Sequence, residues 1–144
     1  MSTLSLSLQH RQQIEKHAQA GYPSEVVGIL AGSQEELQVQ RVQTLENERA
    51  DTHNRYKVSG LTLYRATQAL EAQGFDILGY YHSHPDHPSQ YSDYDREHAL
   101  PNLSYVIISI NKGDVGTIQS WRLSEDRTHM IEEALEITSR HTPV

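Results

Sequence analysis

The stretch His82-Ser83-His84-Pro85 decides the interpretation of this chain. The residues before it, at 76–81, read Asp-Ile-Leu-Gly-Tyr-Tyr, and this mostly apolar run with β-branched and aromatic types is typical of a buried strand. Because successive side chains of a strand point to opposite faces, His82 and His84 are expected to share one face while Ser83 points to the other. Pro85 is expected to end the strand, since it has no N–H to donate to a neighbour.

The residues after this strand complete a candidate metal site. Residues 86–91 are turn-rich and show no periodicity. Ser92 is a plausible N-cap for a short helix with acidic residues in its first turn. Asp95, on that helix, can return to the strand end as a third ligand beside the two histidines. Two His and one carboxylate leave a fourth tetrahedral position for water, which is the arrangement of a catalytic zinc site.

Each of these residues also has a purely structural interpretation. A His-x-His pair is common in strands without any metal, Ser92 can serve only as a helix cap, and Asp95 can serve only the helix dipole. The joint pattern, with two His, then Ser, then Asp after an apolar strand, favours the metal site over these separate interpretations.

The combined motif resembles the zinc signature of the JAMM (MPN+) metalloproteases. That family also needs an upstream glutamate, for which Glu25 is the candidate, within a segment at 22–32 that looks like the first strand of the family. The resemblance runs from about Leu8 to about Trp121. It implies one α/β domain over residues 1–144, with the MPN (cytidine-deaminase-like) fold and a mixed β-sheet flanked by helices.

The resemblance further implies a function. The chain looks similar to small bacterial members that process ubiquitin-like sulfur-carrier proteins, whose C-terminal Gly-Gly tail threads the cleft as an extended strand. Those members often carry a Cys pair after the glutamate, where this chain has Val26 and Val27. That pair is not part of the metal site, so the ligand set is unaffected. The chain is too short for the long insertions with which eukaryotic relatives grip linked ubiquitin chains.

The chemistry implied by the resemblance assigns a role to each residue. One zinc per chain, held by His82, His84 and Asp95, lowers the pKa of its bound water. Glu25 acts as general base and then general acid, and Ser92 donates a hydrogen bond to the oxyanion. Without the family pattern, Glu25 would be interpreted as an ordinary solvated acid at a strand edge.

Composition narrows the class of protein. A chain of 144 residues is long enough to bury a core. The formal net charge of -7 argues against nucleic acid or an anionic membrane as a partner. The absence of Cys excludes disulfides, thiolate zinc sites and cysteine-protease chemistry. No apolar run approaches a membrane span, so we expect a soluble cytoplasmic protein, and the sequence leaves open whether it forms a homodimer.

The remaining sequence predicts alternating helices and strands. Helices are expected at 9–20 and 61–73, and strands at 26–31, 36–45, 56–58, 105–110 and 116–123. The segment 129–137 is ambiguous, because its Glu-Glu-Ala-Leu favours a helix whereas similar small family members end in a strand. Trp121 is expected to pack in the core. The other histidines are not predicted to be metal ligands. His87 is expected beside the site, and the rest are expected outside it: His98, His53, His10, His17, His129 and His141.

Two other classes of function remain to be distinguished from the protease. A catalytically silent scaffold of the same fold is disfavoured because His82, His84, Asp95 and Glu25 are all present. A small-molecule zinc hydrolase such as a deaminase is disfavoured because the Cys ligands typical of that chemistry are absent.

Overall fold

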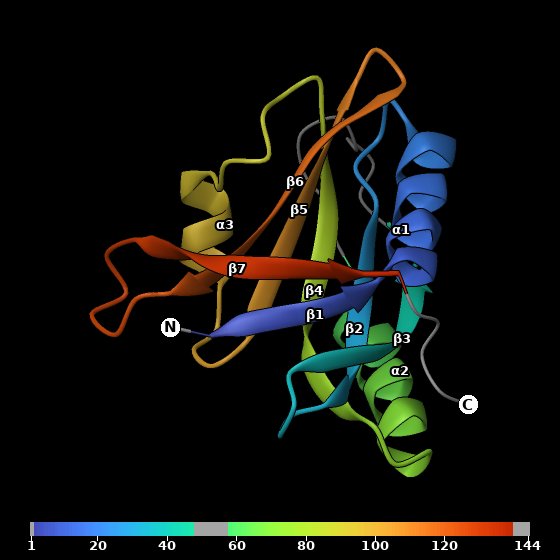
Figure 1. Cartoon of the computed structure of the whole chain (residues 1–144), viewed down its shortest axis with the longest axis vertical. Helices are drawn as coiled ribbons and strands as arrows, with labels where there is room; N and C mark the ends of the chain where they lie inside the picture. The colour runs from blue at the N-terminus through green and yellow to red at the C-terminus, as the bar shows by residue number, and fades with distance from the viewer. Residues whose placement is uncertain (1, 48–57, 140–144) are drawn as a thin grey trace.

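The computed structural model describes residues 2–47 and 58–139. Its elements follow one another as shown in Figure 1. They are β1 (Thr3–Ser7), α1 (Leu8–Gly21), β2 (Val27–Ser33), β3 (Gln38–Leu45), α2 (Gly60–Ala72), β4 (Asp76–Pro85), α3 (Asp93–His98), β5 (Ser104–Asn111), β6 (Asp114–Leu123) and β7 (Met130–Thr138). None of the helices among these residues is long and apolar enough to cross a membrane.

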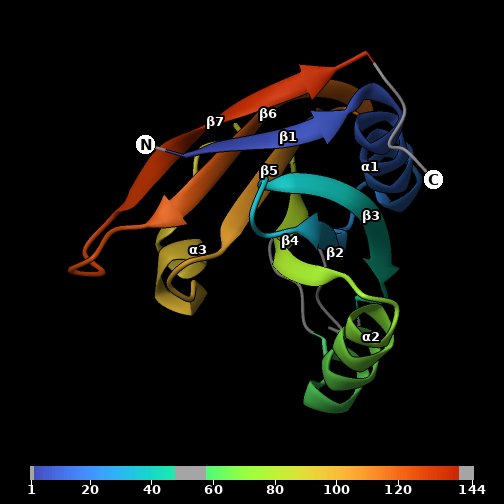
Figure 2. The ribbon, with the colours of Figure 1, turned by 60° about the horizontal axis from the view of Figure 1, so that its bottom comes forward.

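The strands form one mixed sheet in the order β1-β3-β2-β4-β5-β6-β7, and its two edges meet to close a barrel. β4 pairs with β2 antiparallel and with β5 parallel, so it is held on both sides. The closure runs through β1, which pairs with β7 in parallel and joins β3 at Ser5↔Gln38. Figure 2 shows β1 lying between β7 and β3. The predicted α/β class and mixed sheet are therefore confirmed.

Alternation along the strands divides the apolar side chains among three clusters. The first cluster joins α1 to one face of the sheet, and it includes Ile14 of α1, Leu30 of β2 and Tyr81 of β4. The second packs Leu70 of α2 against the opposite face of β2, and the third gathers Trp121 with residues beside α3. The candidate site lies on the face of β4 turned away from α1, and α2 and α3 both lie on this face (Figures 1 and 2).

Two elements at the ends of the chain differ from the sequence-based picture. The ambiguous segment forms strand β7, because it pairs with β6 over Met130–Glu133 and with β1 from Ala134 onward. β1 was not predicted, although Leu4 and Leu6 alternate with polar residues and are fully buried. The strand predicted at 56–58 falls outside the described residues except for Val58, which is not in a strand.

Candidate metal centre

β4 presents two imidazoles from its carboxyl end. His82 pairs with Val27 of β2 and Ile107 of β5, so the backbone that carries it is fixed from both sides. His82 is 2% exposed and His84 is 9% exposed. Between them, the Ser83 Oγ points to the other face and accepts the Val26 N–H at 2.9 Å. The predicted alternation of these three side chains is confirmed.

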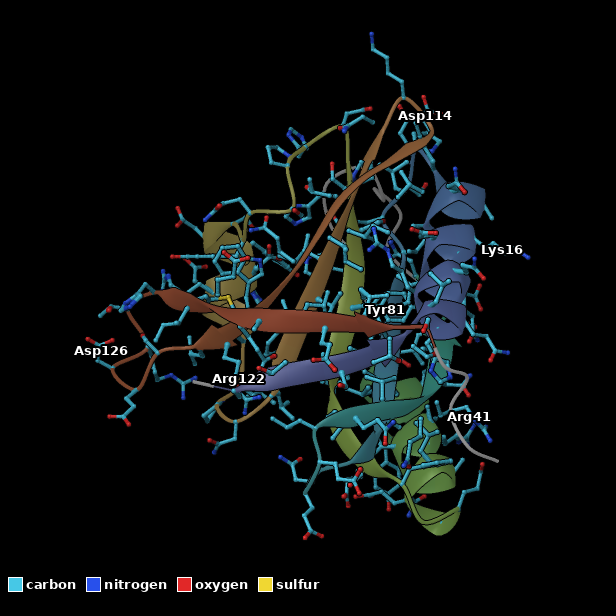
Figure 3. All side chains as sticks on the ribbon, viewed as in Figure 1. Lys16, Arg41, Tyr81, Asp114, Arg122 and Asp126 are labelled. Carbon is cyan, nitrogen blue, oxygen red and sulfur yellow. The ribbon has the colours of Figure 1, made fainter. Side chains whose placement is uncertain are left out.

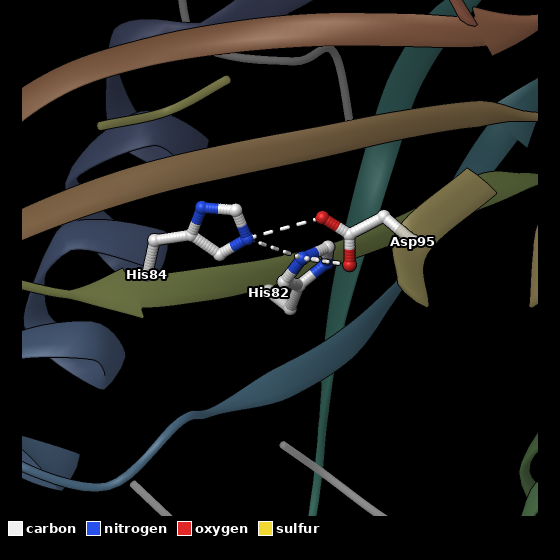
Figure 4. A group of neighbouring side chains, drawn as sticks. All are labelled: His82, His84 and Asp95. Carbon is white, nitrogen blue, oxygen red and sulfur yellow. Dashed lines mark hydrogen bonds and ion pairs between the residues drawn. The ribbon is translucent and has the colours of Figure 1, made fainter. Parts of the chain in front are cut away.

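The third donor comes from the start of α3. Ser92 is the N-cap: its Oγ accepts the Asp95 N–H at 3.1 Å, and its own N–H donates to Asp95 Oδ2 at 2.9 Å. This reciprocal capping box fixes the Asp95 carboxylate over β4. Asp95 Oδ1 lies 3.1 Å from His82 Nε2, and Oδ2 lies 3.1 Å from His84 Nε2 (Figure 4). The predicted helix and its N-cap are confirmed.

The three donor atoms fit a metal ion. The two Nε2 atoms are 3.2 Å apart, and the ligand atoms of His82, His84 and Asp95 all lie within 4.8 Å of one another. Two ligands of a tetrahedral zinc, each about 2.0–2.1 Å from the ion, are roughly 3.3 Å apart. His84 Nδ1 lies 2.8 Å from the Pro88 carbonyl, to which it can donate, so Nε2 can offer a lone pair. Nitrogen, nitrogen and carboxylate oxygen form a donor set that suits zinc.

The electrostatics of the group agree with a cation site. Burial alone would raise the pKa of Asp95, but the charge of His82 and hydrogen bonds from His82, His84 and the Ser92 N–H hold it far below its usual value. Burial alone would lower the pKa of His84, but the hydrogen bond and charge of Asp95 raise it overall, helped by the Pro88 carbonyl and the charge of Glu25. The carboxylate therefore stays ionised, and the site favours positive charge.

Glu25 lies in the same pocket but outside the donor group. The pocket measures about 430 Å³ and is lined by Glu25, His84, Pro85, His87, Pro88, Gln90, Ser92 and Asp95. Glu25 is 5% exposed and lies two residues before β2, in the segment that leads into this strand rather than in the strand itself. The adjoining backbone is fixed to β4, since the Ser83 N–H donates to the Val26 carbonyl at 3.1 Å. Glu25 therefore shares a pocket with His84 and Asp95, and its role as general base stays a prediction.

Of the other described histidines, one lines the pocket and the rest make contacts elsewhere. His87 lines the pocket, whereas His98 stacks on Tyr94 and its Nδ1 bonds the Tyr94 carbonyl. His17 bonds the Tyr81 hydroxyl beneath α1. The remaining described ones, His10 and His129, contact Ser7 and Thr128 respectively. His53 and His141 lie outside the described residues.

Two parts of the site were not predicted from the sequence, the Gln90 side chain and the Pro88 carbonyl. A main-chain oxygen is present at every residue, so no sequence pattern can indicate it.

The comparisons with known proteins agree with this geometry. The sequence profile of a family described as "Prokaryotic homologs of the JAB domain" matches residues 7–124. The chain belongs to the prokaryotic JAB (JAMM) family. The resemblance inferred from the His82–Asp95 motif is thereby confirmed.

Relatives of this JAB-family protein include a desampylase from Haloferax volcanii, 34% identical over 113 residues that cover 75% of this chain and 81% of the relative. A Thermus thermophilus protein named "Probable TtuB-protein conjugate cleaving protease" is 35% identical over 96 residues, covering 67% of this chain and 63% of that protein. A JAB1/MPN domain protein from Archaeoglobus fulgidus has the same fold, with a TM-score of 0.63, 19% identity, and coverage of 94% and 99%. Family membership and the donor set make the chain a JAMM-type peptidase.

Proposed function

We propose that this protein is a zinc-dependent protease or isopeptidase that hydrolyses the bond after the C-terminal Gly-Gly of a ubiquitin-like sulfur-carrier protein. The observation that carries the proposal is the convergence of His82, His84 and Asp95 at 3.1–3.2 Å, with Glu25 in the same pocket. The names of the two curated relatives, a desampylase and a conjugate-cleaving protease, support the same class of substrate. One zinc per chain, a single domain over residues 1–144 and a cytoplasmic location belong to this proposal.

The mechanism assigns His82, His84 and Asp95 to hold the zinc ion. When bound, zinc makes water a better nucleophile and polarises the carbonyl of the bond that breaks. Glu25 accepts the proton of the attacking water and returns it to the leaving amine. Its burial beside the donor group keeps this carboxylate within the pocket where the proton is released. Ser92 donates a hydrogen bond from its hydroxyl to the oxyanion that forms on the carbonyl.

The substrate tail fits the pocket as an extended chain. The loop between β4 and α3 lines the pocket with His87 and Gln90. Glycine residues have no side chains and allow a close approach of the tail backbone to Pro85 and Pro88, which also line the pocket. Residues beyond the second glycine leave with the amine.

Mass spectrometry of a carrier protein tests the function. A ubiquitin-like protein that bears Gly-Gly followed by extra residues, and the same protein joined through Gly-Gly to a lysine side chain, are incubated with the zinc-loaded enzyme. We expect a mass loss that leaves Gly-Gly as the new C-terminus. A carrier whose Gly-Gly is changed to Ala-Ala serves as the control. Zinc-loaded protein that cleaves neither form would contradict the proposal and favour the silent scaffold.

A substitution series at Ser92 separates capping from catalysis. Ser92→Ala removes the hydroxyl that accepts the Asp95 N–H, so we expect a loss of about 1 kcal/mol in unfolding free energy. If Ser92 also donates to the oxyanion, kcat of the fully zinc-loaded variant should fall roughly 10²-fold. Ser92→Asp keeps a good N-cap but places negative charge beside the oxyanion. We expect it to be folded, zinc-loaded and nearly inactive in the carrier assay, and an active Ser92→Asp enzyme would leave capping as the whole role.

A further inference from the structure

The loop between β4 and α3 is held by three consecutive main-chain carbonyls. The His87 carbonyl accepts the Ser109 hydroxyl at 2.6 Å, and the Ser89 carbonyl accepts the Trp121 Nε1–H at 3.0 Å. Between them lies the Pro88 carbonyl, 2.8 Å from His84 Nδ1. The two outer donors come from β5 and β6, strands that contribute nothing to the metal donor group.

The side chain of Ser89 fixes the same loop a second time. It is fully buried, with a relative exposure of 0%. Its Oγ donates to Gln119 Oε1 at 2.6 Å and lies 2.6 Å from Thr117 Oγ1. Since the Ser89 proton is committed to Gln119, Thr117 is the donor in the second contact. Ser89 is therefore attached to β6 through both its side chain and its carbonyl.

These contacts matter because of what the Pro88 carbonyl does. An imidazole that donates from Nδ1 carries its lone pair on Nε2, and a fixed acceptor sets both the tautomer and the ring orientation. His84 Nε2 is the atom that lies 3.2 Å from His82 Nε2 and 3.1 Å from Asp95 Oδ2. The direction of the Pro88 carbonyl is set by the peptide unit that joins Pro88 to Ser89. Ser109 holds the preceding peptide through the His87 carbonyl, and Trp121 holds the following peptide through the Ser89 carbonyl, so the Pro88–Ser89 peptide between them is fixed at both ends.

We propose that Ser109, Ser89 and Trp121 are positioning residues that hold the Pro88 carbonyl against His84, and so keep the His84 Nε2 lone pair directed at the metal. The inference rests on the proposed zinc site. It gives Trp121 a role besides its packing against Tyr91, where the ring centroids are 5.1 Å apart.

Three variants test this inference against a matched control. Ser109→Ala removes the hydroxyl on the His87 carbonyl, and Ser89→Ala removes the contacts to β6. Trp121→Phe keeps an aromatic ring beside Tyr91 but removes the N–H. The control is Tyr81→Phe, which removes a buried hydroxyl that lies 2.6 Å from His17 on the opposite face of β4. Figure 3 labels Tyr81, which lies between the sheet and α1.

The first measurement is the rate at which zinc-loaded protein releases its metal to an excess of chelator. We expect faster release in each of the three variants, by up to about 10- to 100-fold, the range of metal affinity lost when the group that orients a metal ligand is removed. Tyr81→Phe should release zinc at the wild-type rate even if its melting temperature falls. Melting temperatures of the metal-free proteins show whether each variant is folded. If Trp121→Phe is not folded, the result for Ser109→Ala decides.

The second measurement is ¹⁵N NMR of His84 in the zinc-loaded protein. The wild type should show a protonated Nδ1 that exchanges slowly with water, and the three variants should show faster exchange of that proton. Folded variants with wild-type zinc release and wild-type exchange would overturn the inference. A wild-type protein that takes up no zinc would instead contradict the proposed function, so the two failures are distinguishable.

Discussion

Replacement of both His82 and His84 by alanine is expected to leave the protein without zinc and without activity. Two of the three donors are lost, and Asp95 as the single remaining ligand cannot compete with water for the ion. The strand should survive, because β4 is paired along both edges by backbone hydrogen bonds. Elemental analysis of the purified proteins checks the prediction, with about one zinc per chain expected in the wild type.

His129→Ala is the matched control for this pair, because His129 is exposed in the turn before β7 and lies outside the donor group. It should retain the zinc content and the activity of the wild type. Circular dichroism shows whether the double variant is folded. Stoichiometric zinc in a folded double variant would disprove the assignment of these two ligands.

Glu25→Gln is expected to bind zinc normally and to lose at least about 10²-fold in turnover, the usual scale for removing a general base. Glutamine keeps the size and hydrogen-bonding capacity of the side chain but cannot accept the proton. Zinc binding should persist because Glu25 is not one of the clustered donors. Zinc content and the rate of carrier cleavage are measured on the same preparation, which separates catalysis from metal binding.

The control for Glu25 is Glu35→Gln, an equivalent change in the exposed turn between β2 and β3. It should cleave the carrier at the wild-type rate. Glu25→Gln with near-normal turnover would mean that this buried acid has only a structural role.

The ends of the chain show where sequence reasoning about the fold stops. The pairs between Thr3 and Ala134 and between Ser7 and Thr138 join residues from opposite ends of the chain, so no local pattern records them. In β7, pairing with β6 up to Glu133 and with β1 from Ala134 overrides the helix preference of residues 132–135. The pairing with β6 places the buried Glu133 beside Ser120, and its carboxylate accepts hydrogen bonds from the hydroxyls of Ser104 and Ser120 and pairs with Arg122.

The residues of the site were predictable from the sequence to different extents, depending on whether local or long-range structure brings them together. His82, His84 and Asp95 are close in sequence, and the strand, turn and helix that join them follow from local rules. Glu25 enters the pocket through the pairing of β2 with β4, so the residues alone could not distinguish it from a solvated acid. Trp121 and Ser109 act on main-chain carbonyls, which are present at every position and leave no signature in the sequence.

The three ligand residues belong to secondary-structure elements of unequal stability. The two imidazoles belong to a strand paired on both sides, whereas Asp95 belongs to α3, a helix of 6 residues with no buried residue of its own. A helix so short is marginal by itself in water. A metal bound by all three donors would therefore also link α3 to β4, and part of its binding energy would hold α3 on the sheet. Because α3 has the weaker support, we expect loss of the metal to begin with movement of Asp95 on α3 rather than with fraying of β4.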